Sequence, residues 1–391
     1  MYVSFKRGWL RGAAVVAASG LLAAGAAQAQ EVVKIGIVTV MSGPFSEFGK
    51  QMETGIRIFQ KERGEMAGGR KVEVIIRDTA GSNPDMAKRL ATELVTRDKV
   101  QALGGFVFTP DTMAVAPVAT QAKVPIIVMN AAGNDITAKS PYMFRTSFGF
   151  GRMVPPMAEW ALKQGWRKAY VLVADYAPGH DVEKAFTTAW QAGGGTVVGT
   201  VRTPISTLDF APYLQRVKDE RPDLLFAFVN GGDVAPALMK QFKERGLAEA
   251  GIKLAGTGDI TDEPTLPAVG DRALGVVTVY PYSMDHRSDL NRRFVQQFQA
   301  MRGTDARPTI MAVGAYDGMA MLYAALDKIK GEVTGDALVE AMKGVSLDSP
   351  RGPIVINATT RDVDQTQYIR RVEKVNGQLA NVEFAEVQDR Q

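Results

Sequence analysis

The chain has 391 residues, 46% of them hydrophobic and 23% charged, and its 46 basic and 42 acidic side chains give a formal net charge of +4. Basic pairs such as Arg292-Arg293 and Arg370-Arg371 stand isolated and form no basic stripe, so nucleic acid is not expected as a partner. There is no cysteine, which excludes disulfides, thiol catalysis and zinc sites that need thiolates.

The N-terminus has the pattern of a signal peptide. An apolar stretch at residues 13–27 follows three basic side chains and ends at Ala27-Gln28-Ala29, the small-residue pattern that signal peptidase reads. The alternative, a membrane anchor, needs about 20 apolar residues, and this stretch is shorter. We therefore expect cleavage after Ala29 and a soluble periplasmic chain of 362 residues, enough for two domains.

Strands and helices alternate from the start of the mature chain. Residues 33–40 form an apolar, strand-like run that breaks at Ser42-Gly43-Pro44. Asn83 and Pro84 are the capping and first residues of a helix expected to run to about Asp98. The next elements are expected in the order strand, helix, strand at residues 102–106, 112–123 and 124–130. This alternation predicts a parallel sheet, with a further strand at 72–78, covered on both faces.

A second unit of the same kind starts near Arg145-Thr146. Its strands are expected at residues 169–175, 197–202, 224–230 and 252–256. The helices between them are expected near residues 179–192, 209–220 and 233–246. Two parallel-sheet lobes therefore follow one another along the chain.

The pattern changes after Gly275. A strand at 276–280 is followed by three helical segments with little strand between them, near residues 290–301, 311–330 and 336–343. These helices need a sheet to cover, and the first lobe is the expected one, so the chain must cross between the lobes more than once. Near the C-terminus, strands at 367–375 and 379–387 flank Asn376-Gly377, which predicts a hairpin.

Several of these segments together resemble the periplasmic leucine/isoleucine/valine-binding proteins, the type I solute-binding proteins of ABC importers. The resemblance covers essentially the whole mature chain and rests on the order and spacing of four segments: residues 41–49 (Met-Ser-Gly-Pro-Phe-Ser-Glu-Phe-Gly), the stretch with Asp78 and Pro84, Gly104-Gly105, and Ala315-Tyr316-Asp317-Gly318. It implies an α/β fold of two Rossmann-like lobes joined by three hinge crossovers, with the ligand held between the lobes.

The same resemblance implies where the lobes begin and end. Crossovers are expected near Thr146-Ser147, 280–283 and 349–353. Lobe 1 would comprise residues 30–147 and 282–348, and lobe 2 residues 148–281 and 349–391.

Ligand sites in open parallel sheets lie beyond the carboxyl ends of the strands. Thr109 is expected to cap a helix there, with Pro110 as its first residue and the amides of Asp111 and Thr112 free to meet a carboxylate. The resemblance assigns carboxylate binding to Thr109 and to Ala131-Ala132. Capping alone is the alternative role of Thr109.

The chain also departs from that family at the expected site. Asn134, after Gly133, stands where the amino-acid binders have a ligand-contacting threonine, and Phe108 replaces a small polar residue. The resemblance makes Asp259 the candidate for the acidic partner of a ligand ammonium. Without such a partner, an amino acid would bury an unpaired charge, whereas a carboxylate lacking an amine would not.

Aromatic residues gather at the same strand ends. Phe48 matches an aromatic position of the family pocket, and Tyr176 and Tyr282 are further candidates beside Phe45, Phe106, Phe108 and Tyr280. Core packing under the loops is the alternative for these rings. Rings suit a flat apolar ligand, so leucine-like amino acids and aromatic acids such as benzoates or cinnamates both remain open.

No catalytic constellation is recognisable. The two histidines, His180 and His286, lie on different predicted segments, which gives little support to a metal site or a Ser-His pair. No cofactor is expected. The sequence therefore predicts a binding protein, compatible with a monomer, that delivers a small carboxylate to an ABC permease or, alternatively, reports it to a membrane receptor.

Overall fold

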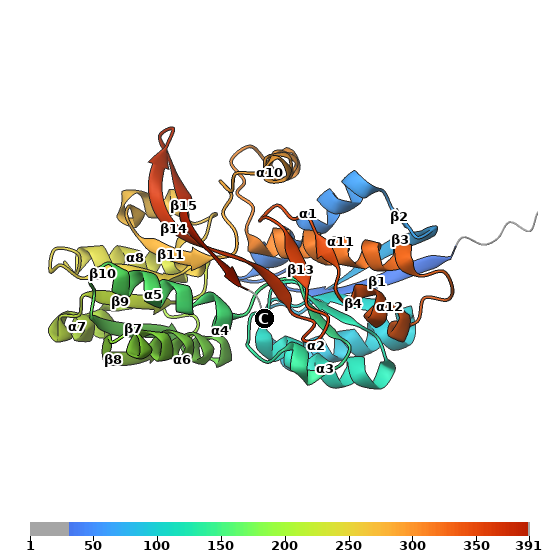
Figure 1. Cartoon of the computed structure of the whole chain (residues 1–391), viewed down its shortest axis with the longest axis horizontal. Coiled ribbons are helices and arrows are strands. Elements are labelled where there is room, and N and C mark those ends of the chain that lie inside the picture. Colours follow the sequence, from blue (N-terminus) through green and yellow to red (C-terminus); the bar gives the residue numbers. More distant parts are fainter. Residues whose placement is uncertain (1–30, 390–391) are drawn as a thin grey trace, which may run out of the picture.

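The computed structural model describes residues 31–389, which form a six-stranded and a nine-stranded sheet lying side by side (Figure 1). The predicted signal peptide falls outside this range. In the six-stranded sheet, the strand order is β2-β3-β1-β4-β5-β6, with β1 at its centre. Only the β2–β3 pair is antiparallel. The strands are β1 (Val32–Thr39), β2 (Met66–Ala67), β3 (Arg70–Asp78), β4 (Ala102–Gly105), β5 (Ile126–Val128) and β6 (Met143–Arg145).

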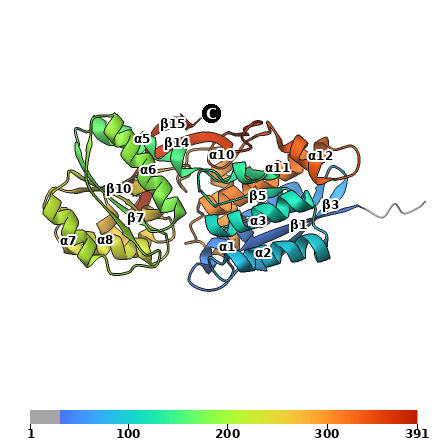
Figure 2. The ribbon, with the colours of Figure 1, turned by 90° about the horizontal axis from the view of Figure 1, so that it is seen from below.

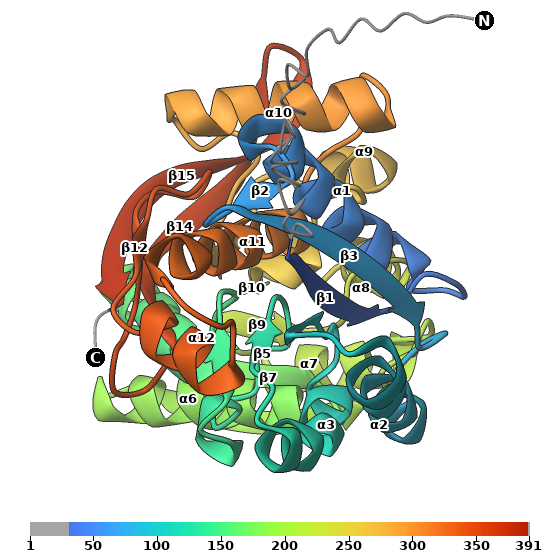
Figure 3. The same ribbon diagram turned by 90° about the vertical axis from the view of Figure 1, so that its right-hand side faces the viewer.

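Helices cover both faces of this sheet, as its pattern predicts. Helices α1 and α11 pack together on one face, and α2 and α3 pack together on the other (Figure 3). Helix α10 lies against α1, and α12 against α11. The helices are α1 (Ser46–Arg63), α2 (Pro84–Glu93) with its π-helical extension Leu94–Asp98, α3 (Thr109–Ala122), α10 (Asp289–Arg302), α11 (Ile310–Lys328) and α12 (Gly335–Met342), and a 3-10 turn spans Thr137–Lys139.

The nine-stranded sheet has the order β12-β13-β14-β11-β10-β9-β7-β8, with β15 paired to β14. Strands β7 to β11 are parallel, and the C-terminal strands join them in antiparallel fashion. The strands are β7 (Lys168–Ala174), β8 (Thr196–Thr203), β9 (Leu224–Phe228), β10 (Lys253–Thr257), β11 (Val277–Tyr280), β12 (Ser346–Leu347), β13 (Ile354–Ile356), β14 (Val363–Val375) and β15 (Gln378–Asp389).

The second sheet also lies between helices (Figure 2). Its central strand β9 shows the two-residue alternation of a sheet covered on both faces, because Leu224, Phe226 and Phe228 belong to one core and Leu225 and Ala227 to another. The helices are α4 (Phe150–Met153), α5 (Pro155–Lys163), α6 (Ala177–Ala192), α7 (Ala211–Glu220), α8 (Val234–Glu244) and α9 (Leu266–Val269), with 3-10 turns at Gly258–Thr261 and Gly270–Ala273.

The chain passes between the two sheets three times within the described range. It leaves the first sheet after β6, returns after β11 to place α10 to α12 against α1, and rejoins the second sheet at β12. The prediction that the late helices cover the first sheet is therefore confirmed. At the hairpin, Asn376 and Gly377 both have positive φ, 51° and 82°, as the predicted tight turn requires.

Buried arginines tie the passages together. Arg351 pairs with Asp317 of α11 at 2.9 Å and donates to the carbonyl oxygens of Thr146 and Ser147, the latter at 2.8 Å. Arg145 pairs with Asp362 through Nε and Nη2, one edge of its guanidinium, and is 1% exposed. Buried arginines thus join the first passage to the third through Arg145–Asp362 and through the hydrogen bonds of Arg351.

No helix in residues 31–389 is both long and apolar enough to cross a membrane.

Candidate functional site

A small cavity of about 50 Å³ lies between the facing carboxyl ends of the two sheets. Both sheets contribute to it: α1, α3 and the loop after β5 from one side, and the starts of α4 and α6 and the loops after β9 and β10 from the other. Its lining residues are Phe48, Val107, Phe108, Thr109, Asn130, Ala132, Phe148, Phe150, Tyr176, Pro178, Phe228, Asn230, Asp259 and Met311. This is the position that the strand-end rule predicts for a ligand.

Thr109 stands at one end of the cavity, in the first turn of α3. The helix begins at Thr109 itself, and Phe108 is the preceding residue, so the predicted cap position was one residue too late. The Thr109 hydroxyl accepts a hydrogen bond from the Gly133 amide at 3.2 Å and does not cap its own helix. Because the helix starts early, the amide of Thr112 already donates to the carbonyl of Phe108 and is not free for a ligand, contrary to our expectation.

The two alanines of the loop after β5 have different roles. Ala132 lines the cavity, next to Thr109. Ala131 does not line it; its backbone amide donates to the Phe106 carbonyl, and its carbonyl accepts from the Ser147 hydroxyl. Of the three residues predicted to bind a ligand carboxylate, Thr109 and Ala132 line the cavity and Ala131 does not.

Six of the fourteen residues that line the cavity are aromatic. Phe150 packs edge-on against both Phe148, at 5.4 Å between ring centroids, and Phe228, at 4.9 Å, and Tyr176 stacks on Phe228 at 6.0 Å. From the first sheet, Phe48 reaches across the gap, since a Cβ placed on Gly231 would lie 3.6 Å from its ring. Such a wall favours a flat, apolar ligand body.

Polar groups lie at the end of the cavity that belongs to the second sheet. The Tyr176 hydroxyl donates to Asn230 Oδ1 at 2.8 Å. Asp259 accepts from the hydroxyls of Thr257 at 2.8 Å and Tyr280 at 3.2 Å. Burial raises the pKa of Asp259, whereas these two hydrogen bonds and the charge of Arg370 act to lower it.

Two further predicted residues lie near the cavity without lining it. Asn134 connects the two lobes: its backbone amide donates to the Asp181 carboxylate of α6 at 3.0 Å, and its side-chain oxygen accepts from the Gly151 backbone amide. Tyr282 is buried after β11 and donates its hydroxyl to Asn291 at 3.0 Å. Both side chains are therefore used to hold the passages between the sheets.

Several lining residues were not predicted. Phe228 is the last residue of β9 and Asn230 lies two residues beyond it, so the same strand-end rule could have identified them. Phe148 and Phe150 follow β6, a strand of only three residues that no sequence pattern indicated. Met311 and Val107 contribute apolar contact from α11 and from the segment before α3.

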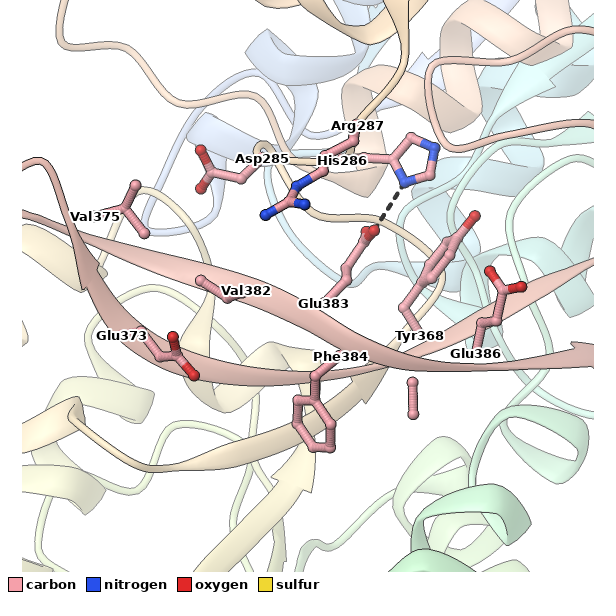
Figure 4. A pocket seen from close by; sticks show the side chains of 11 residues that line it. Asp285, His286, Arg287, Tyr368, Glu373, Val375, Val382, Glu383, Phe384 and Glu386 are labelled. Carbon is pink, nitrogen blue, oxygen red and sulfur yellow. Dashed lines mark hydrogen bonds and ion pairs between the residues drawn. The ribbon is translucent and has the colours of Figure 1, made fainter.

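A larger hollow of about 630 Å³ lies elsewhere, against the β14–β15 hairpin (Figure 4). His286 points toward Glu383 there and pairs with it at 2.9 Å. Glu373, Glu386 and Asp285 also line this hollow. Four of its eleven lining residues are acidic, and these carboxylates would repel a carboxylate ligand, so the small cavity between the sheets is the candidate site.

Two α/β lobes that meet at their strand ends, enclose a ring-lined cavity and are joined by three passages define a class of protein: a hinged binding protein that closes around a small molecule. A family model described as periplasmic binding protein matches residues 32–378. The chain belongs to the periplasmic binding protein family, which consists of solute-binding proteins and not of enzymes.

Relatives agree with this assignment. The chain is 43% identical over 355 residues to "Leu/Ile/Val-binding protein homolog 6" of Brucella melitensis, which covers 91% of both chains. Among solved structures, it is similar to a solute-binding protein of an ABC transporter from Rhodopseudomonas palustris BisB5 in complex with 3,4-dihydroxybenzoic acid, with 46% identity, a TM-score of 0.88, and coverage of 92% of this chain and 98% of that one. Another R. palustris solute-binding protein, in complex with 4-hydroxybenzoate, has 40% identity, a TM-score of 0.88 and the same coverage.

Proposed function

We propose that this protein captures a small aromatic carboxylate between its lobes and delivers it to the permease of an ABC importer. The observation that carries this proposal is the ring wall, in which six aromatic side chains surround one cavity: Phe48, Phe108, Phe148, Phe150, Tyr176 and Phe228. Each ring contact with an aromatic ligand contributes about 0.5 to 1.5 kcal/mol beyond the burial of apolar area. The ligands of the two R. palustris relatives are of this class.

The carboxylate is proposed to lie in lobe 1, against Thr109 and Ala132. The first turn of α3 presents the positive end of a helix dipole there, and anions are stabilised at such ends. Asn130 lies beside them in the cavity wall and is anchored by its own amide, which donates to the Val107 carbonyl at 3.0 Å. The aromatic body would then extend toward lobe 2.

A branched-chain amino acid is the second candidate, and the names of the Brucella relatives favour it. In that case Asp259 would pair with the ammonium. However, this carboxylate already accepts hydrogen bonds from Thr257 and Tyr280, and the guanidinium of Arg370 lies 5.0 Å from the Tyr280 ring. A nearby cation weakens Asp259 as a partner for a second one.

Several features of the mature protein belong to the same proposal. Cleavage after Ala29 releases a periplasmic monomer whose lobes comprise residues 30–147 with 282–348 and 148–281 with 349–391. A subunit that reports ligand to a membrane receptor would share the fold and the site. Genes for permease and ATPase subunits beside this one would support import.

The test is the melting temperature of the mature protein, refolded to remove carried-over ligand, with benzoate, 4-hydroxybenzoate, leucine and phenylalanine at millimolar concentration. A ligand present at 100 times its Kd stabilises the fold by about 2.7 kcal/mol. We expect stabilisation by the amine-free acids and none by the amino acids. A response to leucine alone would instead assign Asp259 to an ammonium, and no response at all would contradict both ligand classes.

A further inference from the structure

We infer that the lobe 2 end of the cavity selects aromatic acids that carry a hydroxyl group opposite the carboxylate, through Asn230 and Asp259 acting as a donor and acceptor pair. This inference rests on the proposed function and specifies the ligand of the same site. It adds a requirement for a hydroxyl that the aromatic wall alone does not impose.

Asn230 supplies the donor. Its side chain lines the cavity and the residue is only 6% exposed. The Tyr176 hydroxyl donates to Oδ1 at 2.8 Å, which fixes the orientation of the amide. The other amide atom, Nδ2, has no hydrogen-bond partner among the described residues. A buried donor without a partner is costly, so a ligand that accepts from Nδ2 removes an existing penalty.

Asp259 supplies the acceptor in the same wall. Oδ2 accepts from Thr257 and Oδ1 from Tyr280, one bond each. A carboxylate offers about four lone-pair positions, so acceptor capacity remains for a ligand. The two hydroxyl donors also hold the carboxylate in place, which makes it a pre-organised acceptor.

Among small polar groups, a hydroxyl fits this pair because it both donates and accepts. It can donate to Asp259 and accept from Asn230 Nδ2 at the same time. An ammonium has donors only, so it would leave Nδ2 unpaired and place a cation against a donor. A second carboxylate could accept from Asn230 but would face the charge of Asp259, and a ring without a substituent would satisfy neither group.

The experiment compares four acids that differ at one position: benzoate, 4-hydroxybenzoate, 4-methoxybenzoate, which cannot donate, and 4-aminobenzoate, which accepts poorly. Dissociation constants are measured by titration calorimetry on the ligand-free mature protein. We expect 4-hydroxybenzoate to bind at least tenfold more tightly than each of the other three. Equal binding of benzoate and 4-hydroxybenzoate would overturn the hydroxyl inference and leave the proposed function standing, whereas no binding by any of the four would contradict the proposed function itself.

Two variants assign the effect to the pair. In Asn230→Leu the donor is lost, and in Asp259→Asn the charged acceptor is replaced by an amide. Each should weaken 4-hydroxybenzoate at least tenfold more than it weakens benzoate, with circular dichroism confirming the fold. Equal losses for both acids would contradict the assignment. The comparison of acids on the unmodified protein decides the inference even if a variant does not fold.

Discussion

Phe48 is the ring that reaches from the first turn of α1 to the opposite lobe. It packs against Phe45 at 5.6 Å and approaches Gly231 of the other side. Phe48→Ala should therefore weaken every ligand of the cavity, aromatic or aliphatic, by roughly tenfold, because about 1.4 kcal/mol of ring contact is lost. Calorimetric titration of the variant checks this. If affinity survives the substitution, the ligand does not bind where the structure places the cavity.

The ionisation of the Asp262 carboxyl group in lobe 2 should make the stability of the protein depend on pH. Burial raises the pKa of Asp262 to about 8, helped by the negative charges of Asp259 and Glu263 and opposed by Arg370. Since the unfolded value is near 4, the folded state holds a proton that the unfolded state has lost between these two pH values. The contribution of this group to stability is therefore complete below about pH 4 and is lost as the pH rises to about 8.

The substitution Asp262→Asn keeps the shape and removes this ionisation. We expect its melting temperature to exceed that of the unmodified protein increasingly between pH 5 and pH 8.5, and the two curves to converge on the acid side. A difference of about 1 kcal/mol corresponds to roughly 2 °C. Differential scanning calorimetry across this range is the measurement. A difference that does not change with pH would show that Asp262 does not titrate there.

At the scale of elements, the third passage is fixed to α11 by Arg351 and Asp317, which are 2% and 0% exposed. Burial raises the pKa of Asp317 to about 6, against the effect of the guanidinium. Replacing Asp317 by Asn leaves a buried cation without its partner and should reduce the free energy of unfolding by about 3 to 5 kcal/mol. Urea denaturation measures this loss.

Two further variants give that experiment its controls. In the double variant Asp317→Asn with Arg351→Met, no uncompensated charge remains, so much of the stability should return. Glu244→Gln removes an exposed pair with Lys240, and its effect should stay within about 0.5 kcal/mol. A double variant as unstable as Asp317→Asn would mean that hydrogen bonding of Arg351 to the first passage, and not its charge, is the stabilising interaction.

The elements could be predicted from sequence wherever a local pattern was strong. Helix α2 begins as expected, with the Asn83 side chain accepting from the Met86 amide and Pro84 following. The hairpin was readable from Asn376-Gly377. Strands β5 and β6 have three residues each, but only β5 was predicted, because it lies in the apolar run 124–129 whereas β6 ends in a charged arginine.

For the candidate site, the sequence could predict which strand ends converge, but not which of the side chains there point into the cavity. Phe48, Phe108, Thr109, Ala132, Tyr176 and Asp259 line the cavity. Asn134 and Tyr282 are as polar and as close along the chain, yet they bond to Gly151 and Asn291. Such choices depend on partners more than eight residues away in sequence, which no local pattern encodes.

At the scale of the whole molecule, the contact between Asn134 and Asp181 joins the two lobes without touching the cavity. The ligand binds the closed form, so its apparent affinity depends on the fraction of protein that is closed. Weakening this contact should lower that fraction and therefore reduce the affinity for all ligands by one common factor. For Asp181→Ala we expect a threefold to tenfold loss, about 1 kcal/mol, for benzoate and 4-hydroxybenzoate alike.

Titration calorimetry of both acids provides the measurement. Asp175→Ala is the matched control, since Asp175 pairs with His180 of the same lobe at 2.8 Å and should leave both affinities unchanged. Unequal losses for the two acids would mean that Asp181 acts on the ligand and not on closure.

Strand β14 pairs with β13 in one part of its length and with β11 in another. Val363 and Asp364 pair with β13 next to the third passage, while Tyr368 to Arg371 pair with β11 deep in lobe 2 (Figure 1). The third passage is thus part of a hydrogen-bonded sheet. We therefore expect the lobes to separate by bending of the paired strands, with their hydrogen bonds intact. Amide hydrogens of residues 363–366 should accordingly exchange with deuterium as slowly as those of the lobe 2 interior, with or without ligand. Rapid exchange there in the ligand-free protein would show that the ladder breaks whenever the lobes part.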